Sequence, residues 1–186
     1  MSTNIFKFFA VISFVLLGFV QNSDANEKVS NSQVNWYTFE EALKLVETEP
    51  RKIFVDIYTD WCGYCKRMDQ VTFSNPVIVS ILNNYYYPVK LNAEQKEPIN
   101  FRGFEFINEN PDQRRSSHNL AIAILQGKMS YPSFAFFDEE LNLITAIPGY
   151  RPPESFEPML MFFANDVYID NPDLDHYIRN FEGTVK

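Results

Sequence analysis

The sequence predicts an α/β domain with a central mixed β-sheet that helices cover on both faces. In the first half, β-branched and aromatic runs typical of buried strands alternate with segments of helical composition. In the second half, two such runs follow each other across a short polar connection, which is the pattern of an antiparallel hairpin. Strands separated by helices need crossovers, whereas strands joined by a tight turn can pair directly.

The amino terminus has the pattern of a secretory signal peptide. Lys7 precedes an uncharged apolar stretch from Phe8 to Val20, and Ser23-Asp24-Ala25 supplies the small residues of a cleavage site. The stretch is shorter than the roughly 20 residues that a membrane-spanning helix needs, so an uncleaved anchor is the less favoured alternative. We therefore expect a signal peptide over 1–25, a periplasmic or secreted location, and no stable membrane association.

The remaining length suits one domain with its own hydrophobic core. We expect a polar linker over 26–35, the α/β domain over 36–169 and an acidic tail over 170–186. Residues 93–115 are polar and interrupt the pattern, so they are predicted to be an insertion, as a hairpin or flap near the functional site or on the far side. A net charge of −8 without a basic cluster argues against nucleic acid as a partner. We expect a monomer.

The first elements follow from capping and burial patterns. A capping box at Thr38 and Glu41 opens a helix. The run Lys52–Thr59 predicts a buried strand, although Asp56 lies in its middle. Two helical pieces follow, and Ser74-Asn75-Pro76 caps the second of them.

The later elements are predicted in the same way. Tyr86–Asn92 is a second strand, in which Pro88 indicates an irregular start or a bend. The rest comprise a helix over Leu120–Leu125 that Gly127 ends, two hairpin strands over Ser133–Asp138 and Leu143–Pro148, and a last helix that opens at Pro152 or Pro153.

The only two cysteines, Cys62 and Cys65, come directly after the first predicted strand. This position places Cys62 at the amino end of a helix, where backbone N–H groups and the helix dipole lower the pKa of a thiol. Cys65 lies one turn further on, close enough to attack a mixed disulfide formed by Cys62. The spacing therefore predicts that Cys62 attacks and Cys65 resolves, through a redox-active disulfide between them.

The cysteine pair has two alternative roles. A purely structural bridge would close a very small loop, which stabilises least. A zinc site needs four ligands, but there is no second cysteine pair, and His118 and His176 are distant in sequence. We expect no metal and no cofactor, and each histidine is predicted to be packed or solvated.

Several separated segments carry a family resemblance. The stretch from Ile53 to Lys66, with Trp61-Cys62-Gly63-Tyr64-Cys65, resembles the active-site strand and helix of the thioredoxin family. Val89-Lys90-Leu91-Asn92 resembles the next strand of the family, Tyr131-Pro132-Ser133-Phe134 its cis-proline loop, and Gly149 a glycine after its final strand. The resemblance covers about Val34 to Tyr168, interrupted by the insertion. Residues 72–76 are similar to periplasmic thioredoxin-like domains that pass electrons to envelope proteins.

The resemblance implies a cis peptide bond at Pro132, which faces the cysteine pair. The backbone of Tyr131 would then bind an extended substrate strand. On the residues alone, an ordinary trans proline is the alternative.

The resemblance also assigns roles to two charged residues. It implies that Asp56 exchanges a proton with Cys65 and that Lys90 is its neighbour. A buried carboxylate in an apolar strand should have a raised pKa suited to that task. Passive burial of Asp56 and solvation of Lys90 remain alternatives.

Trp61, Gly63 and Tyr64 flank the thiols and are predicted to contact substrate, although ordinary aromatic packing is an alternative.

The predicted activity is thiol:disulfide exchange with proteins of the cell envelope or secreted proteins, driven by an upstream thiol electron donor. Gly63-Tyr64 resembles the dipeptide of periplasmic disulfide isomerases. Those isomerases carry a dimerisation domain before the thioredoxin module, where this chain has a short linker, so reduction is favoured over isomerisation or oxidation. A non-catalytic peptide-binding module and a metal carrier remain alternative functions.

Overall fold

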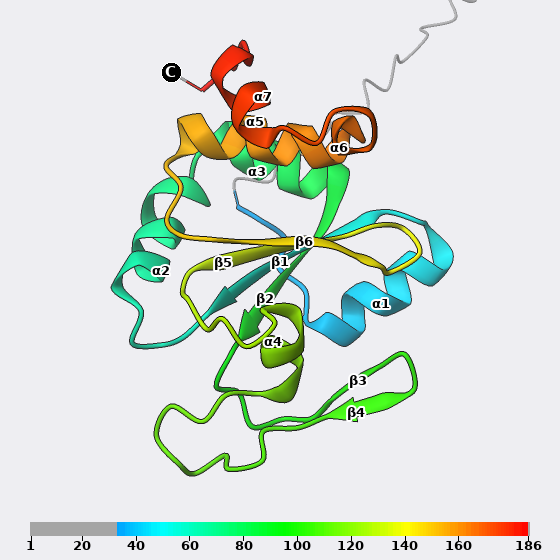
Figure 1. Ribbon diagram of the computed structural model, residues 1–186, viewed down its shortest axis with the longest axis vertical. Helices are drawn as coiled ribbons and strands as arrows, with labels where there is room; N and C mark the ends of the chain where they lie inside the picture. The colour runs from blue at the N-terminus through cyan, green and yellow to red at the C-terminus, as the bar shows by residue number, and fades with distance from the viewer. Residues whose placement is uncertain (1–32, 186) are drawn as a thin grey trace, which may run out of the picture.

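The computed structural model describes residues 33–185. The predicted signal peptide and most of the predicted linker lie outside these residues. Figure 1 shows a central sheet with helices on both sides of it. The described part of the linker is anchored, since the Asn35 backbone N–H donates to Asn83 Oδ1 at 2.8 Å.

The central sheet has four strands in the order β2-β1-β5-β6. They are β1 (Lys52–Tyr58), β2 (Tyr86–Asn92), β5 (Ser133–Phe137) and β6 (Leu143–Pro148). β1 pairs parallel with β2 and antiparallel with β5, and β6 completes an antiparallel hairpin with β5. The mixed sheet predicted from the sequence is therefore confirmed.

Helices cover both faces of the sheet, as predicted. One core lies under α1 (Phe39–Thr48) and α4 (Asn119–Ile124), and the other under α3 (Pro76–Tyr85) and α5 (Pro153–Ala164). Along β1, Val55 faces the first core and Phe54 faces the second, because successive side chains of a strand point to opposite faces.

The predicted bend at Pro88 is absent, and β2 pairs with β1 in continuous register through this residue. The carbonyl of Pro88 accepts a hydrogen bond from Tyr37 at 2.9 Å, on the side of β2 away from β1. The N–H and C=O of one strand residue point the same way, so the N–H that proline lacks would also face this outer edge. Proline at position 88 therefore removes no hydrogen bond from the ladder between β2 and β1.

The predicted insertion contains a hairpin of β3 (Ile99–Phe101) and β4 (Phe104–Phe106). Phe101 packs edge to face against Phe39 of α1 and Phe137 of β5, with ring centres 5.2 and 6.1 Å apart. The hairpin thereby extends the core under α1. The hairpin and the loop after it lie beyond the carboxyl ends of β1 and β2 (Figure 1).

The segment after α5, of which the sequence predicts residues 170–186 to be a tail, folds back on α5. It forms α6 (Val167–Asp170) and α7 (Leu174–Asn180), and Tyr177 packs on Phe162 with ring centres 5.2 Å apart. Backbone N–H groups of Thr184 and Val185 donate to the buried carboxylate of Glu157 at 2.8 to 3.0 Å. These hydrogen bonds fix the end of the chain against α5, and the composition of the segment did not predict this packing.

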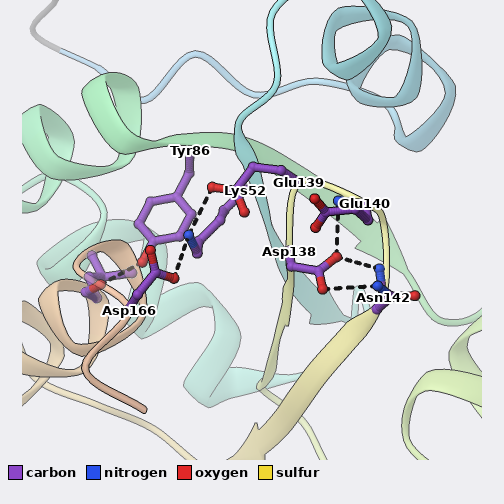
Figure 2. A network of polar contacts seen from close by, with 8 residues as sticks. Lys52, Tyr86, Asp138, Glu139, Glu140, Asn142 and Asp166 are labelled. Carbon is purple, nitrogen blue, oxygen red and sulfur yellow. Dashed lines mark hydrogen bonds and ion pairs between the residues drawn. The ribbon is translucent and has the colours of Figure 1, made fainter. Parts of the chain in front are cut away.

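A buried lysine joins three elements at the start of β1. Lys52 is only 4% exposed, and its ammonium lies 2.8 Å from both Glu139, in the β5–β6 turn, and Asp166, between α5 and α6 (Figure 2). Burial disfavours the charge of Lys52, but the two carboxylates outweigh it and raise its pKa. Beside it the Tyr86 hydroxyl donates to the Leu160 carbonyl at 2.5 Å. The network closes the end of the sheet opposite the cysteines.

We expect Lys52→Met to lower the free energy of unfolding by about 2 kcal/mol. This is less than a fully buried pair would lose, because both carboxylates keep partial contact with water. Urea unfolding measures the change. Lys96→Met, which breaks the exposed ion pair to Asp112, is the control and should cost no more than about 1 kcal/mol. Equal stability of the Lys52 variant and the wild type would contradict the prediction.

Candidate active site

Cys62 and Cys65 form a disulfide at the start of the first helix after β1. Their sulfurs are 2.07 Å apart. Cys62 is the N-cap of α2 (Gly63–Arg67), which continues into a π-helical segment, η1 (Met68–Thr72). The Cys62 backbone N–H donates to Thr59 just beyond the end of β1, so the strand fixes where this turn begins. The predicted position of Cys62 is confirmed.

A backbone donor is aimed at the sulfur of Cys62. The N–H of Cys65 lies 3.0 Å from Cys62 Sγ, in the geometry of a side-chain N-cap. When the disulfide is reduced, the same N–H can stabilise a thiolate at Cys62 more than a thiol. Both cysteines are buried, and a Cβ added to Gly63 would meet nothing within 4 Å. The backbone at Gly63 therefore borders open space.

Asp56 is buried under the helix that carries the cysteines. Its side chain is 1% exposed, and its Oδ2 lies 2.9 Å from Lys90 Nζ, since the two residues are paired in the β1–β2 ladder. Among residues 33–185, Oδ1 of Asp56 has no hydrogen-bond partner. Burial raises the pKa of Asp56 to about 6, although Lys90 opposes the rise. The predicted burial, neighbour and direction of the pKa shift are all confirmed.

Lys90 also binds a second carboxylate, which the sequence reasoning missed. Its ammonium contacts Asp69 of η1 as well as Asp56. The rings of Trp36, Tyr58 and Phe73 surround this ammonium, with their centres 4.9 to 5.2 Å from Nζ. Asp69 follows Cys65 by four residues, and this spacing was the available signal, because it places two residues on one face of a helix.

We expect Asp69→Asn to lower the pKa of Asp56 below about 6. The variant removes a nearby negative charge and leaves Lys90 to Asp56 alone. Titration of the Asp56 carboxyl carbon by NMR measures the shift. Asp112→Asn, a charge loss at a 91% exposed ion-paired carboxylate, should leave the pKa where it was. A raised or unchanged pKa of Asp56 in the Asp69→Asn variant would contradict the claim that Asp56 and Asp69 share Lys90.

The loop before β5 has the predicted cis peptide bond, between Tyr131 and Pro132. The carbonyl of Pro132 accepts a hydrogen bond at 2.8 Å from Gly149, whose φ of 101° favours glycine. The Tyr131 ring meets Trp61 edge to face with ring centres 5.9 Å apart. The structure thus brings the cis-proline loop against the residue that precedes Cys62.

Two exposed aromatic side chains flank the cysteines. Trp61 is 51% exposed and Tyr64 is 64% exposed, and Tyr64 packs on Tyr150 with ring centres 5.8 Å apart. Sequence reasoning did not find Tyr150, nor Arg115 and Glu94 of the insertion, which both contact Trp61. Both ends of the insertion therefore lie beside Trp61, while its hairpin packs elsewhere.

The two histidines belong to elements that do not carry the cysteines. His118 is buried, and its Nδ1 accepts the Leu120 N–H at the start of α4, while His176 is in α7. Within residues 33–185, no three His, Cys, Asp or Glu side chains are grouped so that they could hold a metal ion. No helix in this part of the chain has the length and apolar character needed to cross a membrane.

Comparisons with known proteins agree with this geometry. A family model described as a thioredoxin-like domain matches residues 39–164. An uncharacterised protein of Archaeoglobus fulgidus is 33% identical over 92 residues, which are 49% of this chain and 71% of that protein. The thiol:disulfide interchange protein DsbD of Haemophilus influenzae is 27% identical over 142 residues, covering 73% of this chain. The match spans about a fifth of that DsbD, 21% of its length.

Solved structures share the fold at low sequence identity. The oxidoreductase DsbH aligns with a TM-score of 0.53 and 15% identity over 79% of this chain and 94% of its own. A thioredoxin from Thermus thermophilus aligns with a TM-score of 0.51 and 15% identity over 81% of this chain and 99% of its own. The fold, the DsbD relatives and the Cys-x-x-Cys disulfide together support a thiol:disulfide oxidoreductase. Since the family model matches more than half of its length, the chain belongs to the family of thioredoxin-like domains.

Proposed function

We propose that this protein reduces disulfides of envelope or secreted proteins through the Cys62/Cys65 dithiol. The observation that carries the proposal is the N-cap geometry of Cys62. Its sulfur accepts a hydrogen bond from the backbone N–H of Cys65 and is also bonded to the Cys65 sulfur. A group that stabilises sulfur anion is needed in thiol–disulfide exchange, whereas a purely structural bridge has no use for one.

The reaction is two successive exchanges. The thiolate of Cys62 attacks one sulfur of the client disulfide, a Cys62–client disulfide forms, and the other client sulfur leaves as a thiolate that takes up a proton. Cys65 then loses its proton and attacks the Cys62 sulfur. The bond between Cys62 and the client breaks, the client sulfur leaves as a thiolate that takes up a proton, and the Cys62–Cys65 disulfide forms. Two electrons pass from the dithiol to the client, and an upstream dithiol donor restores them.

In this mechanism Asp56 accepts the proton of Cys65. The carboxylate is tied through Lys90 to Asp69, one turn after Cys65 on the same helical run, so it lies beneath that run. A base with a pKa of about 6 is ionised at neutral pH and can still release the proton it takes. Lys90 acts on Asp56 rather than on the client, and it holds the carboxylate in place.

The client is proposed to lie as an extended segment between the cis-proline loop and the exposed aromatic rings. The contact of Tyr131 with Trp61 supports this place, because it puts the backbone before Pro132 next to the residue that precedes Cys62. Trp61 and Tyr64 would offer apolar contact, and Gly63 would present a backbone free of a side chain to the client.

An extracytoplasmic location is part of the proposal. The signal-peptide pattern over 1–25 supports it, as does the similarity to proteins named thiol:disulfide interchange protein DsbD. The proposed donor is therefore a dithiol available outside the cytoplasm, and the client is a protein disulfide in the same compartment.

Insulin reduction tests the activity, and a redox potential tests its direction. The full chain with dithiothreitol should precipitate insulin faster than dithiothreitol alone, and a Cys62→Ser/Cys65→Ser double variant should not. A potential near −270 mV, the value of thioredoxin, would agree with reduction, whereas one near −120 mV would indicate an oxidase. Equal rates with and without active cysteines would contradict the enzymatic proposal.

A further inference from the structure

The insertion is fixed at its base by one buried amide. Asn108 Nδ2 donates to the carbonyls of Ser116 at 2.9 Å and Gln95 at 3.3 Å, and its Oδ1 accepts from the Ser116 hydroxyl at 2.6 Å. The His118 N–H donates to the Ala93 carbonyl at 2.7 Å. The two ends of the insertion are thereby held side by side, so the residues next to them have defined positions.

Both ends of the insertion meet the tryptophan that precedes Cys62. The indole N–H of Trp61 donates to Glu94 Oε1 at 2.9 Å, and the guanidinium of Arg115 lies 4.7 Å from the centre of the Trp61 ring. Arg115 has a φ of 62°, a left-handed conformation that costs a residue with a side chain about 1 kcal/mol or more. The surrounding fold, not local preference, therefore places Arg115 on this ring.

Arg115 is exposed, and the N–H groups of its guanidinium are available to donate hydrogen bonds. Within residues 33–185, no hydrogen bond or ion pair engages it, and Glu94 is bonded to the indole instead. A guanidinium stacked on a ring keeps its N–H groups at the edge of the stack, where their planar fork matches a carboxylate.

We propose that Arg115 is a specificity-determining residue and selects client segments with an aspartate or glutamate beside the reacting cysteine. The inference rests on the proposed thiol–disulfide exchange and names the class of client. A client strand that passes the cis-proline loop must pass Trp61, because Tyr131 contacts that ring, and Arg115 lies over the same ring. The chain's net charge of −8 works against acidic clients at long range, so the selection acts through a direct contact.

Paired peptide disulfides test the inference. Three disulfide-linked peptide dimers would carry Asp, Lys or Asn next to the cysteine, and rates of their reduction by the reduced full chain would be followed by acid quenching and mass spectrometry. The Asp-to-Lys rate ratio of the wild type is divided by that of Arg115→Gln, which cancels the peptides' own reactivities. We expect a quotient of at least about 1.4 to 5, the fold-change that corresponds to one exposed ion pair, and repulsion between Arg115 and the Lys peptide adds to it.

Three comparisons separate the possible outcomes. Arg102→Gln removes the same charge from the hairpin turn, where Arg102 binds Asn142 at 2.7 Å, and should leave the rate ratio as in the wild type. Relative to the wild type, Arg115→Glu should reduce the Lys peptide faster, and Arg115→Gln should lose more of the wild-type rate with the Asp peptide than with the Asn peptide. Equal ratios for wild type and Arg115→Gln would overturn the inference. Failure of the wild type to reduce the Asn peptide would instead contradict the proposed function.

Discussion

Cys62→Ser is expected to reduce insulin no faster than dithiothreitol alone. Serine keeps the shape of the side chain, but its hydroxyl is not ionised near neutral pH and cannot attack a disulfide. Cys65, the remaining thiol, lies within α2 and does not have the N-cap position of Cys62. Turbidity of precipitating insulin measures the effect. Retention of more than a small fraction of the wild-type rate would show that Cys62 is not the attacking residue.

Cys65→Ser is the matched variant and should behave differently. Cys62 keeps its backbone donor, because the N–H that it accepts belongs to the main chain of residue 65. The first exchange then proceeds and the second cannot, so mixed disulfides with clients accumulate. Non-reducing electrophoresis of cell extracts should show adducts that disappear on reduction. Equal trapping by both single variants would remove the distinction between attacking and resolving cysteine.

Asp56→Asn is expected to slow the second exchange and to stabilise the fold. A general base contributes typically about 100-fold or more to a proton transfer, and asparagine cannot accept the proton of Cys65. The wild-type rate of mixed-disulfide resolution should rise with pH through about 6, the pKa of Asp56, and the variant should lack this rise. Rapid-quench kinetics between pH 5 and 8 measures both effects. Asp60→Asn, at an exposed carboxylate near the cysteines, should keep the rise.

The stability effect has a defined sign. Asp56 has a pKa of about 6 in the folded protein and about 3.8 in the unfolded chain. Its carboxyl group therefore stays protonated up to a higher pH in the folded state. Stability from this group is fully present below pH 4 and is lost as the pH rises through 6. The difference of about 2 pKa units corresponds to about 3 kcal/mol. Urea unfolding at pH 7 should therefore show that Asp56→Asn is more stable than the wild type. A less stable variant would contradict the claim that the buried charge of Asp56 destabilises the folded protein.

The order of elements could be predicted because each signal is local. The capping box at Thr38 appears as two reciprocal hydrogen bonds, and the N-cap at Asn75 and the hairpin strands β5 and β6 also occur where the sequence indicated. The error at Pro88 and the unpredicted packing of α7 have a common cause. The straight course of β2 at Pro88 and the packing of α7 both depend on which element lies next to the segment. The residues of the segment itself do not specify that neighbour.

The cysteine pair, its helix start and the charged strand residue Asp56 were determined by the sequence alone, because each depends on spacing along a few residues. Only the tertiary structure decided that Asp69 shares Lys90 with Asp56 and that the insertion brings Glu94 and Arg115 to Trp61. Arg115 is more than fifty positions after Trp61, and an arginine in a polar loop gives no periodic or capping signal. Its position follows from the hydrogen bonds of Asn108 and from the packing of the whole insertion, which form only when the chain folds.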